Sequence, residues 1–268
     1  GVAALAFGAS GAIVGPVPLL GSKLVNSSGP ASLDNDYAPA TGSTLVVVIG
    51  YWHSTGPPTL TDDRGNTIPA PVTTASGSFN SNLSMYVIPD CVGGAGAFTA
   101  HVPSGQVSGD LNLDVYEFDP AWFDGTLDGT PVTHANTGTT VASGDLVTSY
   151  DGSMLFAPYY DQSNGSSTVT NSLSSGVQIG LNNNTSGGET SEAYAVYGAD
   201  AGTYADTKTT SAGGSNALHI ILAAFKRTAP PAGAITGGVD VVFDASASLA
   251  GAGALSGACA LAFGSSAA

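Results

Sequence analysis

The chain has four histidines and three glutamates, and their spacing limits the acid–base chemistry open to it. The histidines are His53, His101, His134 and His219. No two of them are separated by one or three residues, the spacing of metal-binding pairs on a strand or helix. His219 is flanked by Leu218 and Ile220, which favours a structural residue in a buried strand over a general base. His53 follows an aromatic pair at the end of a strand-like run, where a binding role is the alternative to a structural one.

Paired carboxylates are the second place to look, since glycoside hydrolysis uses two of them roughly 5 to 9 Å apart. The glutamates are Glu117, Glu189 and Glu192. Glu117 lies between Tyr116 and Phe118, with Trp122 just beyond, so these rings could line a sugar-binding face. No partner acid can be identified from spacing, and no G-x-S-x-G nucleophile turn is present. The sequence therefore predicts no catalytic residues.

Two acidic stretches resemble calcium loops only in part. The stretch DQSNGSS (161–167) supplies Asp161, but Ser172 stands where an EF-hand loop closes with glutamate. The stretch TDDRGNT (61–67) has adjacent acids, yet Asp, Gly and Asn are also the residues of tight turns. Both patterns favour turns, and we expect neither a metal nor a cofactor.

Two cysteines, Cys91 and Cys259, make neither a disulfide framework nor a zinc site. A bridge between them is one alternative and two free thiols are the other. The cellular compartment therefore cannot be read from cysteine usage.

The charge balance excludes several classes of partner. Five basic residues face 20 acidic ones, for a net charge of −15, and charged residues make up only 9% of the chain. Such a surface repels nucleic acid and anionic lipid headgroups. No apolar run reaches the roughly 18–20 residues of a membrane span, so we expect no membrane insertion. The apolar first 20 residues could instead be a signal-peptide remnant, although they lack a basic leader.

The middle of the chain reads as a series of short strands. Runs rich in β-branched, aromatic or alternating apolar residues occupy 43–52, 82–89, 110–118, 153–160, 191–198 and 217–225. Stretches rich in Gly, Asn and Asp separate them, and no long stretch has helical periodicity. We predict an all-β, jelly-roll-like sandwich of two sheets over 18–228.

The two ends of the chain repeat one motif. GVAALAFGAS opens the sequence, and GACALAFGSS lies close to its end, with a related copy around Phe243. The alternation of small and large residues predicts short strands, which need neighbours to bury a face. We therefore expect an N-terminal β-repeat arm at 1–17, and a Pro/Gly linker with C-terminal β-repeats at 229–268. A flexible linker is the alternative.

The repeats resemble minor tail and fibre-like virion proteins of tailed bacteriophages, in which G-x-A-x-L-x-F-G-A-S units flank β-sandwich modules. Residues 1–10, 243–246 and 261–266 carry the match, with Asp244 departing from the glycine of the other copies. The middle is similar to sandwich modules of phage and secreted bacterial proteins. Its matching parts are the strand from Thr44 to Trp52, residues 61–67, and the closing strand that ends at Lys226.

The resemblance implies a non-enzymatic, extracellular structural part of a virion, present in many copies. Its expected partners are further copies of the chain, with a trimer favoured, other virion proteins and host-surface glycans. A secreted bacterial adhesin or a carbohydrate-binding module of a larger protein is the first alternative. A glycoside-active jelly roll using Glu117 is the second.

Aromatic residues near strand ends are the candidates for a glycan-binding face, because rings stack on the apolar faces of sugars. They are Tyr51, Trp52, Trp122, Tyr159 and Tyr160. The competing interpretation, packing in the core or at a sheet edge, is favoured, so no binding residue is predicted.

Overall fold

The chain is described by a computed structural model, and every regular element in its described residues is a β-strand. Those residues are 19–52, 58–76, 81–103, 110–162, 169–173, 176–184, 189–210 and 217–228. The predicted arms at 1–17 and 229–268 lie outside them. The all-β class is confirmed, and each of the six predicted runs coincides with a strand to within two residues.

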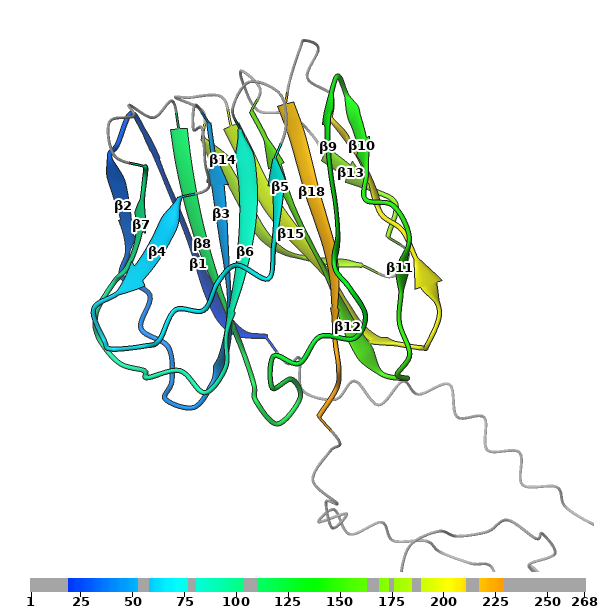
Figure 1. Cartoon of the computed structure of the whole chain (residues 1–268), viewed down its shortest axis with the longest axis horizontal. Helices are drawn as coiled ribbons and strands as arrows, with labels where there is room; N and C mark the ends of the chain where they lie inside the picture. Colours follow the sequence, from blue (N-terminus) through cyan, green and yellow to red (C-terminus); the bar gives the residue numbers. More distant parts are fainter. Residues whose placement is uncertain are drawn as a thin grey trace, which may run out of the picture. The chain divides into compact units, whose positions relative to one another are not determined.

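Two five-stranded antiparallel sheets form the centre of the fold (Figure 1). The first contains, in spatial order, β1 (Leu19–Ser28), β8 (Asp110–Phe118), β3 (Thr44–Tyr51), β6 (Asn82–Ile88) and β5 (Thr73–Ser76). The second contains β14 (Val177–Asn184), β15 (Glu189–Ala199), β12 (Ser153–Asp161), β18 (Ala217–Phe225) and β9 (Val132–Thr137). We call them the first and second central sheets.

Smaller sheets cover the outer faces of both central sheets. The first covering sheet contains β2 (Ser32–Asn35), β7 (Phe98–His101) and β4 (Thr59–Asp62). The second contains β10 (Thr140–Ala142), β17 (Thr207–Thr210) and β13 (Val169–Asn171), beside the pair β11 (Leu146–Val147) and β16 (Thr203–Tyr204). Figure 1 shows these as outer layers on either side of the two central sheets.

The sandwich therefore has more layers than the two that the sequence predicted. Every residue of β3, β8, β12 and β18 is buried, because each of these strands packs against another sheet on both of its faces. In β3 the run TLVVVIGY supplies β-branched residues to both faces, which suits a strand with no solvent-facing side.

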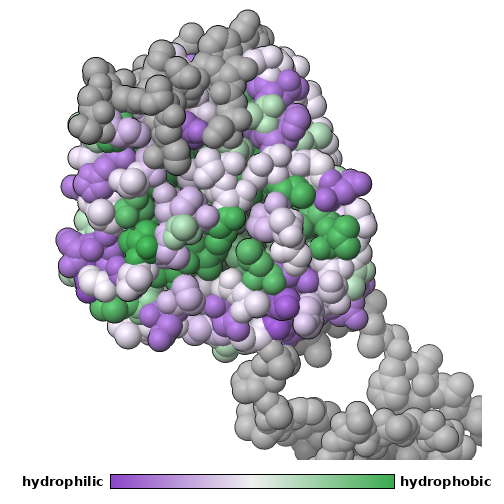
Figure 2. Space-filling model, viewed as in Figure 1, coloured by the Kyte–Doolittle hydropathy of each residue, from purple (hydrophilic) through white to green (hydrophobic). Residues whose placement is uncertain are grey.

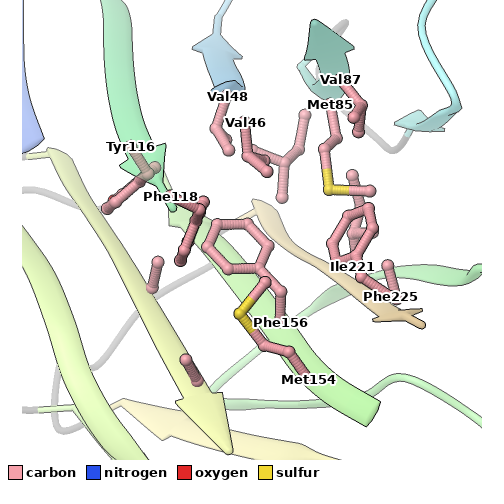
Figure 3. Packing of buried hydrophobic residues seen from close by; sticks show 14 of the residues in the cluster. Val46, Val48, Met85, Val87, Tyr116, Phe118, Met154, Phe156, Ile221 and Phe225 are labelled. Carbon is pink, nitrogen blue, oxygen red and sulfur yellow. The ribbon is translucent and has the colours of Figure 1, made fainter. Parts of the chain in front are cut away.

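Large apolar side chains fill the space between the central sheets (Figure 3). Phe118 makes edge-to-face contacts with Phe123 and Phe156, at ring-centroid distances of 6.2 and 6.3 Å. Val46, Val48, Met85 and Val87 line the first sheet, and Met154, Phe156, Ile221 and Phe225 line the second. This cluster joins the two central sheets into one core.

The two halves of the chain repeat one strand order. In the first half, strands 1-8-3-6-5 form the central sheet and strands 2-7-4 cover it. The second half gives the same order once β11 and β16 are set aside: 9-18-12-15-14, covered by 10-17-13. The jelly-roll connectivity stays an interpretation, which the neighbouring strands 1-8-3-6 and 2-7-4 favour.

Strand pairing aligns the halves residue by residue. Phe118 pairs with Thr44 on β3, and Phe225 pairs with Met154 on β12. Counting along these strands, Gly50 is equivalent to Tyr160. The Tyr160 ring packs on the bare backbone of Gly50, where a Cβ atom would lie 2.5 Å from Cδ2. The two halves therefore contact each other where the Tyr160 side chain of one packs on Gly50, the equivalent residue of the other.

Both ends of the described chain lie at the same end of the central sheets. Leu19, the first residue of β1, pairs with Phe118, and Phe225, the last residue of β18, pairs with Met154. Phe118, Met154 and Phe225 belong to the cluster between the central sheets, and Leu19 packs against it. We call this end the base and the opposite end, where β3 and β12 finish, the tip (Figure 1).

Replacing Gly50 by alanine tests the contact between the halves. The Tyr160 ring cannot retreat freely because it stacks on His219, with ring centroids 6.1 Å apart. We expect Gly50→Ala to lower the free energy of unfolding by about 1–3 kcal/mol, measured by urea denaturation.

Gly202→Ala is the matched control, because its added Cβ would meet only ordinary contacts at 3.7 Å or more. This change should stay within about 0.5 kcal/mol of wild type. Equal effects of the two substitutions would contradict the close packing of Tyr160 on Gly50.

Candidate functional site

Four of the five candidate aromatic residues lie near the tip, but three of them are unavailable to a ligand. Tyr51, Tyr159 and Tyr160 are fully buried, so their interpretation as core residues is confirmed. Trp52 is partly exposed directly after β3, and its backbone N–H donates to the Asp110 carbonyl. Trp52 is therefore the candidate ring that remains accessible at the tip.

Trp122 lies at the base and fastens the end of β18. The Arg227 guanidinium stacks over its ring at 4.1 Å, and the Thr228 N–H donates to its carbonyl over 2.8 Å. Lys226 similarly lies 4.1 Å from the centroid of the Tyr150 ring. Trp122 therefore packs against the last two described residues of the chain, Arg227 and Thr228.

A polar layer separates the central sheets near the tip. Ser81 and Nε2 of His219 are hydrogen-bonded at 2.6 Å, and the Ser191 hydroxyl donates to Asp114 over 2.7 Å. Burial lowers the pKa of His219 to about 4, so the imidazole is neutral near pH 7. These residues come from both sheets and are all buried.

Several polar atoms in this layer have no hydrogen-bond partner among the described residues. They are both side-chain atoms of Asn112, the Tyr116 hydroxyl and Nδ1 of His219. Because Nδ1 has no acidic partner there, Ser81 and His219 lack the third group of a Ser-His-Asp arrangement. The pair is therefore part of the packing between the sheets, as expected for His219.

The candidate carboxylate Glu117 has structural partners. Its two oxygens accept a hydrogen bond from the Tyr37 hydroxyl at 2.5 Å and from the Ala40 N–H at 2.7 Å. These bonds hold the segment that connects β2 to β3 against strand β8. Glu117 is 4% exposed, so it faces the protein interior rather than a sugar.

The stretch 61–67 forms a turn closed by Asp62. Its carboxylate accepts from the backbone N–H groups of Arg64 and Asn66, both at 3.1 Å, and forms a buried ion pair with Arg64. Arg64 also donates to the carbonyls of residues 37, 94 and 96, and lies 4.6 Å from the centroid of the Phe98 ring. The preference for a turn over a calcium loop is thus supported by the hydrogen bonds of Asp62.

The second covering sheet holds a buried ionic cluster that the sequence analysis missed. Lys208 on β17 is fully buried, with Nζ 3.2 Å from Asp206 and 3.9 Å from Glu192 on β15. The same Nζ lies 3.7 Å from the centroid of the Tyr194 ring. Asp206 and Lys208 are two residues apart, which places both on one strand face and is the signal that could have found them.

The remaining candidate residues do not gather with these groups. His101 hydrogen-bonds Thr61 at 2.8 Å, and His134 is exposed on β9. His53, Cys259 and the side chain of Glu189 lie outside the described residues. Cys91 is a buried free thiol. Within the described ranges, no group of three or more His, Cys, Asp or Glu side chains could hold a metal ion, and no helix could span a membrane.

Comparison with known proteins gives no match. No protein family matches the chain, and no curated protein or solved structure resembles it closely enough to be counted.

The burial of neutral His219 predicts a loss of stability in acid. The unfolded chain binds a proton at this site near pH 6.5, whereas the folded protein binds it only near pH 4. Stability from this residue is therefore complete above pH 6.5 and falls, as the pH decreases to 4, by about 3 kcal/mol. We expect His219→Gln to remove that part of the decrease, measured by urea denaturation at pH 7.5 and 4.5.

The exposed His134→Gln variant is the control, and its pH dependence should match that of wild type. The assignment fails if His219→Gln and wild type lose the same stability between the two pH values.

Proposed function

We propose that the chain is a non-enzymatic structural component of a phage virion, a tail or capsid-surface fibre module. In this proposal the repeat arms assemble several copies, with a trimer favoured, and other virion proteins hold them in place. The folded body is displayed outside the particle, where its tip binds host-surface glycans.

The observation that carries the proposal is the placement of the first and last described strands. β1 begins and β18 ends at the base, where Leu19 and Phe225 lie within one core cluster or directly against it. The described part of the chain therefore begins and ends at the base. A module anchored at one end and presented at the other needs this arrangement.

The use of positive charge supports an exposed, soluble module. All five basic side chains are engaged within the folded body: Lys23 with Asp36, Arg64 with Asp62, Lys208 with Asp206, Lys226 with Tyr150, and Arg227 with Trp122. The net charge of −15 is thus presented with no cluster of free cations among the described residues. Nucleic acid and anionic membranes are poor partners for such a surface.

The face drawn in Figure 2 shows apolar side chains in small groups separated by polar ones. Such dispersion suits a surface exposed to water.

Native mass spectrometry of the full chain and of residues 19–228 tests the assembly role of the arms. We expect a trimer or larger species for the full chain and a monomer of unchanged far-ultraviolet circular dichroism for the shortened one. A monomeric full chain would contradict the virion proposal and favour the alternative, a secreted adhesin or carbohydrate-binding module.

Binding to a panel of bacterial surface polysaccharides tests the tip. We expect Trp52→Ala to weaken binding at least tenfold, because one ring supplies the stacking area. Trp122→Ala alters an indole at the opposite end and should retain binding. If the two variants bind alike, Trp52 is not the glycan-contacting residue.

A further inference from the structure

The ionic cluster of Lys208, Asp206 and Glu192 has the composition and placement of a condensation site. Lys208 and Asp206 belong to the second covering layer, and Glu192 belongs to the second central sheet. All three side chains are at most 1% exposed. An amine and two carboxyl groups are therefore held together away from water.

The atoms that face one another in this cluster contact each other as ion pairs. Nζ of Lys208 lies 3.2 Å from Oδ2 of Asp206 and 3.9 Å from Oε1 of Glu192, and none of these three atoms has a hydrogen-bond partner outside the cluster among the described residues. The other oxygens are held: Gln178 donates to Oε2 of Glu192 over 3.0 Å, and Ser172 donates to Oδ1 of Asp206 over 3.4 Å. One oxygen of each carboxyl group, Oε2 of Glu192 and Oδ1 of Asp206, is held by a hydrogen bond. The other oxygen of each group faces Nζ of Lys208.

We propose that Lys208 Nζ condenses with the side-chain carboxyl of Glu192 to form an intramolecular amide between the second covering sheet and the second central sheet. The separate side chains in the structure describe the state before condensation. This inference concerns the stability of the folded body and does not depend on the proposed function.

The step balances without an oxidant or a co-reactant. Asp206 takes a proton from the Lys208 ammonium, and the neutral amine attacks Cδ of Glu192. The N–H of Gln178 stabilises the negative charge that develops on Oε2. The C–Oε1 bond then breaks: Oε1, which carries the proton of the Glu192 carboxyl, takes one further proton from Asp206 and leaves as water. Asp206 takes up the second amine proton, so the products are the amide, water and a protonated Asp206.

The charge states required for this step agree with the surroundings. Burial raises the pKa of Glu192 to about 7, so the protonated, electrophilic acid is present near neutral pH. Burial also lowers the pKa of Lys208. Asp161 and Asp206 raise the pKa of Glu192 further, while Lys208 and Gln178 lower it. Condensation removes two ionisable groups from a site where each is costly to keep charged.

The amide would add a covalent cross-link between two layers whose apolar side chains pack together. It closes a loop between residues 192 and 208, so β17 could not separate from β15 without breaking a covalent bond. Such a link reduces the conformational entropy of the unfolded chain and slows separation of the two layers.

Intact mass spectrometry of the purified full chain under denaturing conditions tests the proposal. We expect a mass lower than that of the sequence by one water, and a proteolytic fragment in which residues 192 and 208 are joined. Lys208→Arg retains the positive charge but not the nucleophilic amine, and should have the full sequence mass. Asp206→Asn removes the base and should leave most of the protein uncondensed.

Lys208→Arg also separates the amide from aspartyl cyclisation, which releases one water at Asp-Gly sequences such as 124–125 and 128–129. A water loss that persists in Lys208→Arg, or a wild-type mass equal to the sequence mass, would overturn the proposal. So would a cross-link that joins Lys208 to Asp206. The wild-type measurement decides the matter even if a variant fails to fold.

Discussion

The two five-stranded sheets carry buried apolar side chains on their outer faces as well as between them, and the need to cover those outer faces governs the rest of the structure. Strands in the centre have no solvent side, so β3, β8, β12 and β18 must be acceptable to an interior on both faces. Any polar group they carry must find a partner inside. The polar layer around His219 holds buried side-chain atoms of Asn112 and Tyr116 that have no hydrogen-bond partner among the described residues.

Each covering layer contains one buried cation. In the first half, Arg64 joins loops by donating to backbone carbonyls and pairing with Asp62. In the second half, Lys208 points at carboxylates from two layers. A planar guanidinium can donate hydrogen bonds to many acceptors at once, whereas an ammonium is a compact charge that interacts with fewer acceptors. The repeated strand order is therefore stabilised by different chemistry in its two copies.

The sequence predicts the central strands because long runs of apolar or alternating residues, such as 43–52 and 217–225, are typical of buried strands and not of turns. It does not predict the covering strands. SLDN, TLTD and TKTT are strands of four mainly polar residues, and such residues also suit turns. The repeat of strand order is hidden as well, because equivalent positions hold Gly50 and Tyr160, or Asn112 and His219. His219 could be judged structural from its neighbours, whereas those of Glu117 suggested a sugar-binding face, and the ionic cluster appears only when separate segments are brought together.

The first and last described strands start and finish at the same end of the central sheets. A unit that begins and finishes at one place can be inserted into, or exchanged between, longer polypeptides. The same property would suit the body as a carrier for grafted recognition loops.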